Sequence, residues 1–188
     1  LWFALQIYFN FIKWEKIMLH EKISSLMNSQ INKEMFSAYL YLDFANFFES
    51  KGLMGFANWY KVQAKEELDH AMLFYQYLQN NNVKVKLEAI GAPDIKLVEF
   101  IDPVRESLRH EEYVTALINK IYSVALEYKD YKSMEFLDWF IKEQGEEELN
   151  AHTLITKMEI FSSDTSALFM LDNELGRRKY SEPDYQFE

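Results

Sequence analysis

The sequence contains no cysteine, and only 5 glycines and 3 prolines occur in its 188 residues. Without cysteine the chain cannot form disulfide bonds, thiolate-bound zinc sites or iron–sulfur clusters. Because glycine and proline are the residues that interrupt helices most strongly, their scarcity favours long helices. Basic residues are also few relative to acidic ones, and the formal net charge of -10 argues against nucleic acid as a partner.

The chain has the length of one domain, and its hydrophobic content of 49% is sufficient for a large core. We expect an apolar extension outside the fold over residues 1–17, a folded domain over residues 18–178 and a polar tail over residues 179–188. The apolar stretch from Leu1 to Trp14 is too short to span a bilayer, which takes about 20 apolar residues. It also lacks the basic leader and cleavage site of a secretory signal, and Met18 offers an alternative start. We therefore expect a cytoplasmic protein without a membrane partner.

Four long segments have helical periodicity, over about residues 19–49, 54–80, 103–129 and 132–161. Pro103 fits the first turn of the third segment, with Asp102 expected as its N-cap. The connection between the second and third segments, of roughly twenty residues, is long enough to run the length of a helix. The sequence thus predicts an all-α four-helix bundle with a long crossover between helices two and three. A short fifth helix is expected over residues 166–175, and its apolar stripe of Leu168, Leu171 and Leu175 is expected to be exposed and to need a partner.

Each long segment has a seam of residues at the alternating spacing of four and three that marks a helix packed in a bundle. Every seam is apolar at both ends and polar near its middle. The polar residues in the middle of the four seams are Gln30, Glu34, Ser37, Tyr41, Gln63, Glu67, His70, Glu111, Thr115, Gln144 and Glu147.

Carboxylates at one level of a bundle predict a metal site. An isolated buried carboxylate costs several kcal/mol, and no Lys or Arg stands at these seam positions to neutralise the charge. Two divalent metal ions would supply it, and oxygen-rich ligation with one imidazole suits iron, manganese or zinc. A single Glu-x-x-His such as Glu67 to His70, or a run of glutamates, occurs by chance on solvated helix faces. One glutamate in the middle of all four seams favours the metal site.

These residues resemble those of the ferritin family, over about residues 18–178, and in particular its bacterial non-haem branch. The matching blocks are NKE at 32–34 with Tyr41, AKEELDH at 64–70, HE at 110–111 and EQGEE at 143–147. The resemblance implies a ferritin-like four-helix bundle and an iron-storage function. It also implies ferroxidase activity, in which Fe(II) is oxidised to Fe(III) by dioxygen or peroxide.

The resemblance implies a di-iron centre within the subunit. Its ligands would be Glu34, Glu67, His70, Glu111 and Glu147. Glu34 and His70 would hold the first iron, and Glu67 would bridge to the second. Gln144 would lie near the second iron, and Tyr41 would hydrogen-bond to one of the ligands.

Two further features follow from the resemblance alone. The bacterial branch has a third iron site, and the matching residues are Glu66, Glu143, Glu146 and Glu147. By spacing, the first three of these lie on helix flanks, where acidic residues are common. The family also forms a hollow homo-oligomeric shell of twenty-four subunits, with the short fifth helix at an axis.

Related proteins and other classes are less consistent with the sequence. Bacterioferritins have a second Glu-x-x-His, but here Glu147 stands at the position of its His, and His152 is out of register. They also have a haem-binding Met, where this chain has Leu68. We therefore expect no haem. Rubrerythrins need cysteine, and mini-ferritins place their metal site between subunits. Two alternatives remain open: a non-catalytic helical bundle, and a ferritin-like di-iron oxidase that acts on an organic substrate.

Deletion of residues 1–17 should leave folding and iron oxidation intact, because the helical pattern begins beyond this stretch. Circular dichroism, gel filtration and the rate of Fe(II) oxidation, compared with the full chain, would check this. A truncated chain that fails to fold or to assemble would show that the stretch is structural.

Overall fold

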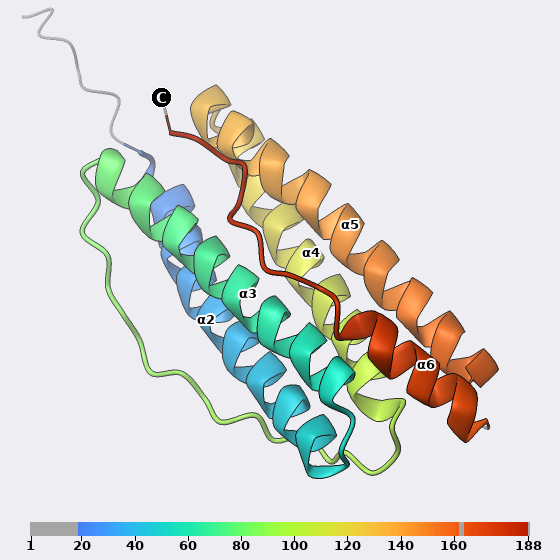
Figure 1. The fold of residues 1–188 in the computed structure, drawn as a ribbon. Coiled ribbons are helices and arrows are strands. Elements are labelled where there is room, and N and C mark those ends of the chain that lie inside the picture. Colours follow the sequence, from blue (N-terminus) through green and yellow to red (C-terminus); the bar gives the residue numbers. More distant parts are fainter. Residues whose placement is uncertain (1–18, 162–163, 188) are drawn as a thin grey trace, which may run out of the picture.

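The computed structural model describes residues 19–161 and 164–187, and within them the chain forms five helices and no strand. The helices are α2 (Glu21–Ser50), α3 (Met54–Asn80), α4 (Asp102–Glu127), α5 (Tyr131–Phe161) and α6 (Thr165–Leu175). The four long helices form a bundle, and α6 lies across one end (Figure 1). None of the described helices is both long and apolar enough to cross a membrane. The expectation for residues 1–17 lies outside the described ranges.

The connections make α2 antiparallel to α3 and α4 antiparallel to α5. The first turn contains Gly52, whose φ of 78° is accessible to glycine without a steric penalty. Between the two pairs, residues 81–101 run the length of the bundle beside α2 (Figure 1). Asn28 holds this connection by donating to the Lys86 carbonyl at 2.9 Å and accepting from the Lys86 N–H at 2.8 Å. The predicted all-α bundle with a long crossover is confirmed.

The start of α4 differs from the expected N-cap. Asp102 is the first residue of the helix rather than its N-cap, which is Ile101. The Asp102 carboxylate points back into the preceding loop, where it accepts from the N–H groups of Val98 at 2.8 Å and Glu99 at 2.7 Å. A carboxylate that satisfies backbone donors of the loop stabilises the helix entry as well, since its negative charge lies at the positive end of the helix.

The core consists of two hydrophobic clusters, one toward each end of the bundle, with the polar seam residues between them. The proposed seams of α2, α3 and α5 are buried throughout. On α4 the expected seam, with steps of four and three from Val104, includes Leu108, Thr115 and Tyr122, and these three are only partly buried. Their neighbours Ser107, Val114 and Ile121 are buried instead. The buried residues of α4 keep the seven-residue repeat, but from Val104 their steps run three and then four rather than four and then three. Both orders repeat every seven residues, so the spacing alone does not distinguish them.

The apolar stripe of α6 packs within the chain, which corrects the expectation that it is exposed. Leu168, Leu171 and Leu175 are buried in the hydrophobic cluster at this end of the bundle. From the same helix, buried Asp172 accepts from the N–H groups of Gly55 at 2.8 Å and Phe56 at 3.0 Å. It therefore caps the N-terminus of α3, whose first N–H groups have no partner within the helix.

Gly55 should be required for this docking, because a Cβ there would lie 1.6 Å from the backbone oxygen of Asp172. We expect Gly55→Ala to lower the free energy of unfolding by about 1–3 kcal/mol. The matched control is Gly145→Ala in α5, where a Cβ would meet nothing within 4 Å. That change should stabilise the protein by about 0.5–1 kcal/mol. Chemical denaturation of both variants measures the difference, and equal effects would contradict the close packing of α6 on α3.

Candidate metal centre

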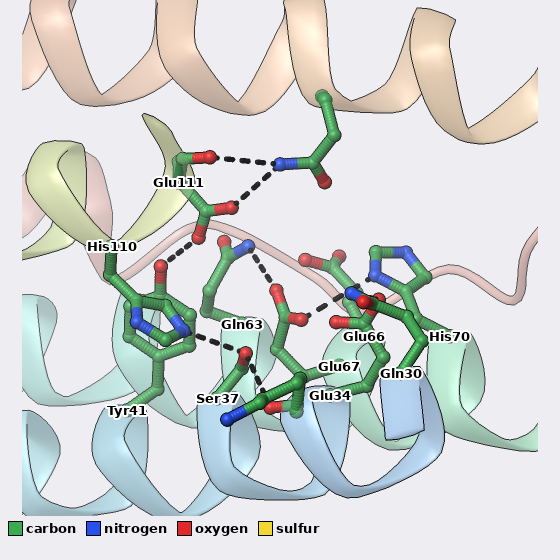
Figure 2. Close-up of polar contacts among 12 residues, drawn as sticks. Gln30, Glu34, Ser37, Tyr41, Gln63, Glu66, Glu67, His70, His110 and Glu111 are labelled. Carbon is green, nitrogen blue, oxygen red and sulfur yellow. Dashed lines mark hydrogen bonds and ion pairs between the residues drawn. The ribbon is translucent and has the colours of Figure 1, made fainter. Parts of the chain in front are cut away.

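The four long helices bring their polar seam residues to one level of the bundle, between the two hydrophobic clusters. Figure 2 labels those of α2, α3 and α4. The buried carboxylates at this level are Glu34 from α2, Glu67 from α3, Glu111 from α4 and Glu147 from α5. Each stands in the middle of a long helix, so its Cα position is set by the packing of apolar residues on both sides. Burial therefore places all four carboxylates away from bulk water.

Three of the predicted ligands form a compact group. One potential ligand atom each from Glu34, Glu67 and His70 lies within 4.8 Å of the others, and all three side chains are buried. The Nδ1 atom of His70 is 3.5 Å from Oε2 of Glu67, one helical turn earlier (Figure 2). The i, i+3 spacing places both side chains on the same face of α3.

Neighbouring side chains hold the group in position. Gln30 donates from Nε2 to Oε1 of Glu34 at 2.9 Å, and Gln63 donates from Nε2 to Oε1 of Glu67 at 3.3 Å. The His70 ring makes edge contacts with two aromatic rings of α5, those of Trp139 and Phe140. Oriented ligands of this kind need little rearrangement to bind a metal ion.

Glu111 is oriented by a different set of donors. The Tyr41 hydroxyl donates to Oε1 of Glu111 (Figure 2). Nε2 of Gln144 donates to Oε2 of Glu111 at 3.1 Å. Glu147 is buried at the same level, with 6% of its surface exposed. In the described part of the chain, Glu111 and Glu147 do not join a second compact group of three ligands.

Electrostatics at this level favour either protons or cations. Burial, followed by the charge of Glu67, raises the pKa of Glu34 to about 8. Burial also raises the pKa values of Glu67 and Glu111 well above the usual range, and neighbouring carboxylates add to the effect. Loss of hydration and like-charge repulsion both disfavour the ionised form. A cation among these carboxylates would reverse the preference.

The donor set fits a hard or borderline divalent metal. Oε2 of Glu34 is buried without a hydrogen-bond partner in residues 19–161 and 164–187, so one acceptor in the compact group is unsatisfied. Unsatisfied buried acceptors are uncommon in folded proteins and call for a ligand or a proton. Carboxylate oxygens with one imidazole nitrogen suit iron, manganese or zinc.

Besides buried Glu147, three residues match a third iron site, and they lie on the flank, where two of them have other partners. Glu66 is partly buried and forms an ion pair with Arg178. Glu143 is also partly buried. The side chain of Glu146 is 61% exposed and lies 3.7 Å from the ammonium of Lys142. The structure thus places these residues around Glu147 without gathering them, and the third site stays a prediction.

Two contributions near the centre were not foreseen from the sequence. Arg178 reaches Glu66 and Gln63 from the far end of the chain, and no local pattern indicated this. On the α2–α4 side, His110 contacts the Ser37 hydroxyl at 2.7 Å, and burial lowers the pKa of His110 to about 4. Ser37 donates to the Lys33 carbonyl, so the neutral imidazole donates to the Ser37 oxygen. The position of His110 beside Glu111 in the sequence was the available signal.

Comparison with known proteins identifies relatives over most of the chain. Residues 24–161 match the family described as Ferritin-like domain. A bacterial non-heme ferritin from Staphylococcus aureus (strain MRSA252) is 33% identical over 165 residues, which cover 88% of this chain and 99% of that protein. A bacterial non-heme ferritin from Staphylococcus epidermidis is 32% identical over the same shares of both chains.

Solved structures give a similar result. The ferritin of the archaeon Archaeoglobus fulgidus, engineered into a closed form, superposes with a TM-score of 0.84 at 37% identity. The alignment covers 87% of this chain and 99% of that one. The open-pore ferritin of the same archaeon superposes with a TM-score of 0.83 at 38% identity, over 86% of this chain and 99% of the other. By sequence and by structure over most of its length, the chain belongs to the ferritin family.

Proposed function

We propose that this protein is an iron-storage ferritin with ferroxidase activity. The observation that carries the proposal is the compact group of Glu34, Glu67 and His70, buried in the middle of the bundle with an unsatisfied oxygen on Glu34. Fe(II) is the substrate: each ion gives up one electron and is stored as Fe(III). Dioxygen is the proposed acceptor, and with two electrons and two protons it leaves as hydrogen peroxide.

Each predicted residue has a distinct role in this proposal. Glu34 and His70 bind the first iron, and Glu67 is shared between the two. Glu111 and Glu147 bind the second. This division is supported by two observations: Glu67 belongs to the compact group, and burial, followed by the charge of Glu147, raises its pKa. Carboxylates suit the chemistry because hard oxygen donors stabilise the more highly charged Fe(III) ion relative to Fe(II).

Two neighbouring side chains complete the second half of the proposed centre. Tyr41 and Gln144 both donate to Glu111, which orients its carboxylate toward the middle of the bundle. Burial raises the pKa of Tyr41 well above its usual range, and the carboxylate of Glu111 adds to the effect. The phenol therefore keeps its proton and serves as a donor.

A di-iron oxidase that acts on an organic molecule is less consistent with the space available. The cavity beside the centre, lined by residues such as Tyr41, Tyr60 and Glu111, has a volume of about 20 Å³. Such a volume holds about one water molecule and no organic substrate. Dioxygen and Fe(II) are small enough to enter with minor side-chain movement. A purely structural bundle is disfavoured because it would have no use for four buried carboxylates at one level.

We further propose a cytoplasmic homo-oligomeric shell. The family resemblance suggests twenty-four subunits, and the described surface offers apolar side chains for contacts between copies. On α6, Phe169 and Met170 are 65% and 72% exposed, although the leucines of this helix are buried within the chain. Large exposed apolar residues that lie side by side are typical of interaction surfaces.

Replacement of Glu67 by Ala should abolish rapid Fe(II) oxidation, because both irons lose their shared ligand. We expect a decrease of more than about 100-fold, beyond the 10–100-fold typical of outer-shell partners. Stopped-flow absorbance of Fe(III) measures the rate. Glu112→Ala is the matched control, since Glu112 is an exposed neighbour of Glu111. Oxidation at the wild-type rate in Glu67→Ala would rule out the di-iron assignment.

The stability of the metal-free protein should fall as the pH rises from about 5 to 8. In this window folded Glu34, with a pKa of about 8, keeps its proton, whereas the unfolded group with an ordinary pKa of 4.5 has lost it. Because the unfolded state then binds fewer protons than the folded state, the free energy of unfolding falls as the pH rises through this window, here by on the order of a few kcal/mol. In Glu34→Gln the slope should be smaller, and in exposed Glu112→Gln it should match the wild type. Urea unfolding across this range tests the expectation, which equal slopes in all three proteins would contradict.

A further inference from the structure

After α6 the chain turns back along the bundle, and we call residues 177–187 the C-terminal strap. In Figure 1 the strap is the dark red trace that leaves α6 and follows α3 and α5 toward the start of α5. It covers the side of the bundle on which Glu66 of α3 and Glu143 of α5 lie. These are two of the residues that match the third iron site.

Contacts to both helices hold the strap along its length. The Tyr180 hydroxyl donates to Oδ2 of Asp69 on α3 at 2.6 Å. Farther along, Trp139 of α5 donates from Nε1 to Oδ1 of Asp184 at 2.7 Å. Near its end the strap places two aromatic rings against Phe136, those of Tyr185 and Phe187. Arg178, at the start of the strap, is therefore fixed by the rest of the segment as well as by its own contacts.

Arg178 contacts three residues of α3. Its guanidinium stacks on the Trp59 ring, 4.1 Å from the ring centroid, and donates from Nη1 to Oε1 of Gln63 at 2.7 Å. From Nη2 it donates to Oε2 of Glu66. The side chains of Arg178 and Glu66 are only 17% and 18% exposed. Because the pair is largely removed from water, its charges are weakly screened.

The contact with Gln63 extends the influence of Arg178 to the metal centre. A guanidinium has only donors, so the amide oxygen of Gln63 must face it and the amide NH₂ must face the other way. That NH₂ donates to Oε1 of Glu67 at 3.3 Å. Arg178 thus sets the orientation of an amide that holds Glu67, the carboxylate assigned to both irons.

We propose that Arg178 is a tethered counter-ion that takes the place of a third metal ion at Glu66 and positions Glu67 through Gln63. This inference rests on the proposed di-metal function. A guanidinium in contact with Glu66 uses one carboxylate oxygen and adds a fixed positive charge, which repels a divalent ion at the same position. While the strap is docked, the flank position is therefore closed, and the resemblance to a third iron site in the sequence overstates the capacity of this chain.

Metal binding without turnover tests the proposal. The metal-free full chain is titrated with Zn²⁺ by calorimetry, as wild type, Arg178→Gln, Arg178→Lys and Arg177→Gln. Arg177 is the matched control, because it is exposed and its change alters the net charge equally. We expect two tightly bound ions in each protein. Arg178→Gln should bind a third ion at least about tenfold more tightly than wild type, which corresponds to about 1.4 kcal/mol. Arg178→Lys should stay near wild type, because it keeps the charge.

The Glu66→Gln background separates this role from a general effect on the fold. The gain from Arg178→Gln should disappear there, because the carboxylate that the third ion would use is absent. The proposal is overturned by unchanged third-ion binding in Arg178→Gln, by an equal gain in Arg177→Gln, or by a gain that persists with Glu66→Gln. Loss of the two tight ions from every protein, wild type included, would instead overturn the proposed function and this inference with it.

Discussion

Burial of four carboxylates at one level of the bundle is the constraint on which the other features depend. Glu34, Glu67, Glu111 and Glu147 are removed from water because two hydrophobic clusters close the bundle above and below them. Removal of hydration from like charges is unfavourable, and it raises the pKa values of three of these groups. Such an arrangement persists only if the apolar packing compensates for it and a cation or protons can neutralise it. The apolar ends of the seams therefore supply the packing energy that allows the polar middle to be buried.

The strap and α6 extend this arrangement from the core to the flank. α6 closes one end through its buried leucines and through the cap that Asp172 provides to α3. The strap then returns along α3 and α5 and places the guanidinium of Arg178 beside Glu66 and Gln63. The amide network connects this cation to Glu67 in the middle of the bundle. On the flank, the guanidinium of Arg178 balances the charge of Glu66. In the core, as we propose, bound metal ions balance the charge of the four carboxylates.

Much of the fold could be predicted from periodicity, because each long helix has to bury one face along its whole length. The seams of α2, α3 and α5 followed this requirement closely. The α4 seam did so only at every seventh residue, because the buried steps run three and then four, which places Ser107, Val114 and Ile121 in the core. The compact group of Glu34, Glu67 and His70 was also accessible to sequence reasoning, because mid-seam carboxylates from neighbouring helices must meet.

The helices, the crossover and the level at which polar residues enter the core could be predicted, because they depend on local periodicity and on the length of a connection. Which surface covers the leucines of α6, and which carboxylate receives Arg178, depends on long-range packing instead. An apolar stripe shows that a partner is needed without identifying it, and here the partner is the chain's own bundle. The contact between Arg178 and Glu66 joins residues 112 positions apart. It depends on the path of the strap over α3 and α5, which no periodicity within the segment specifies.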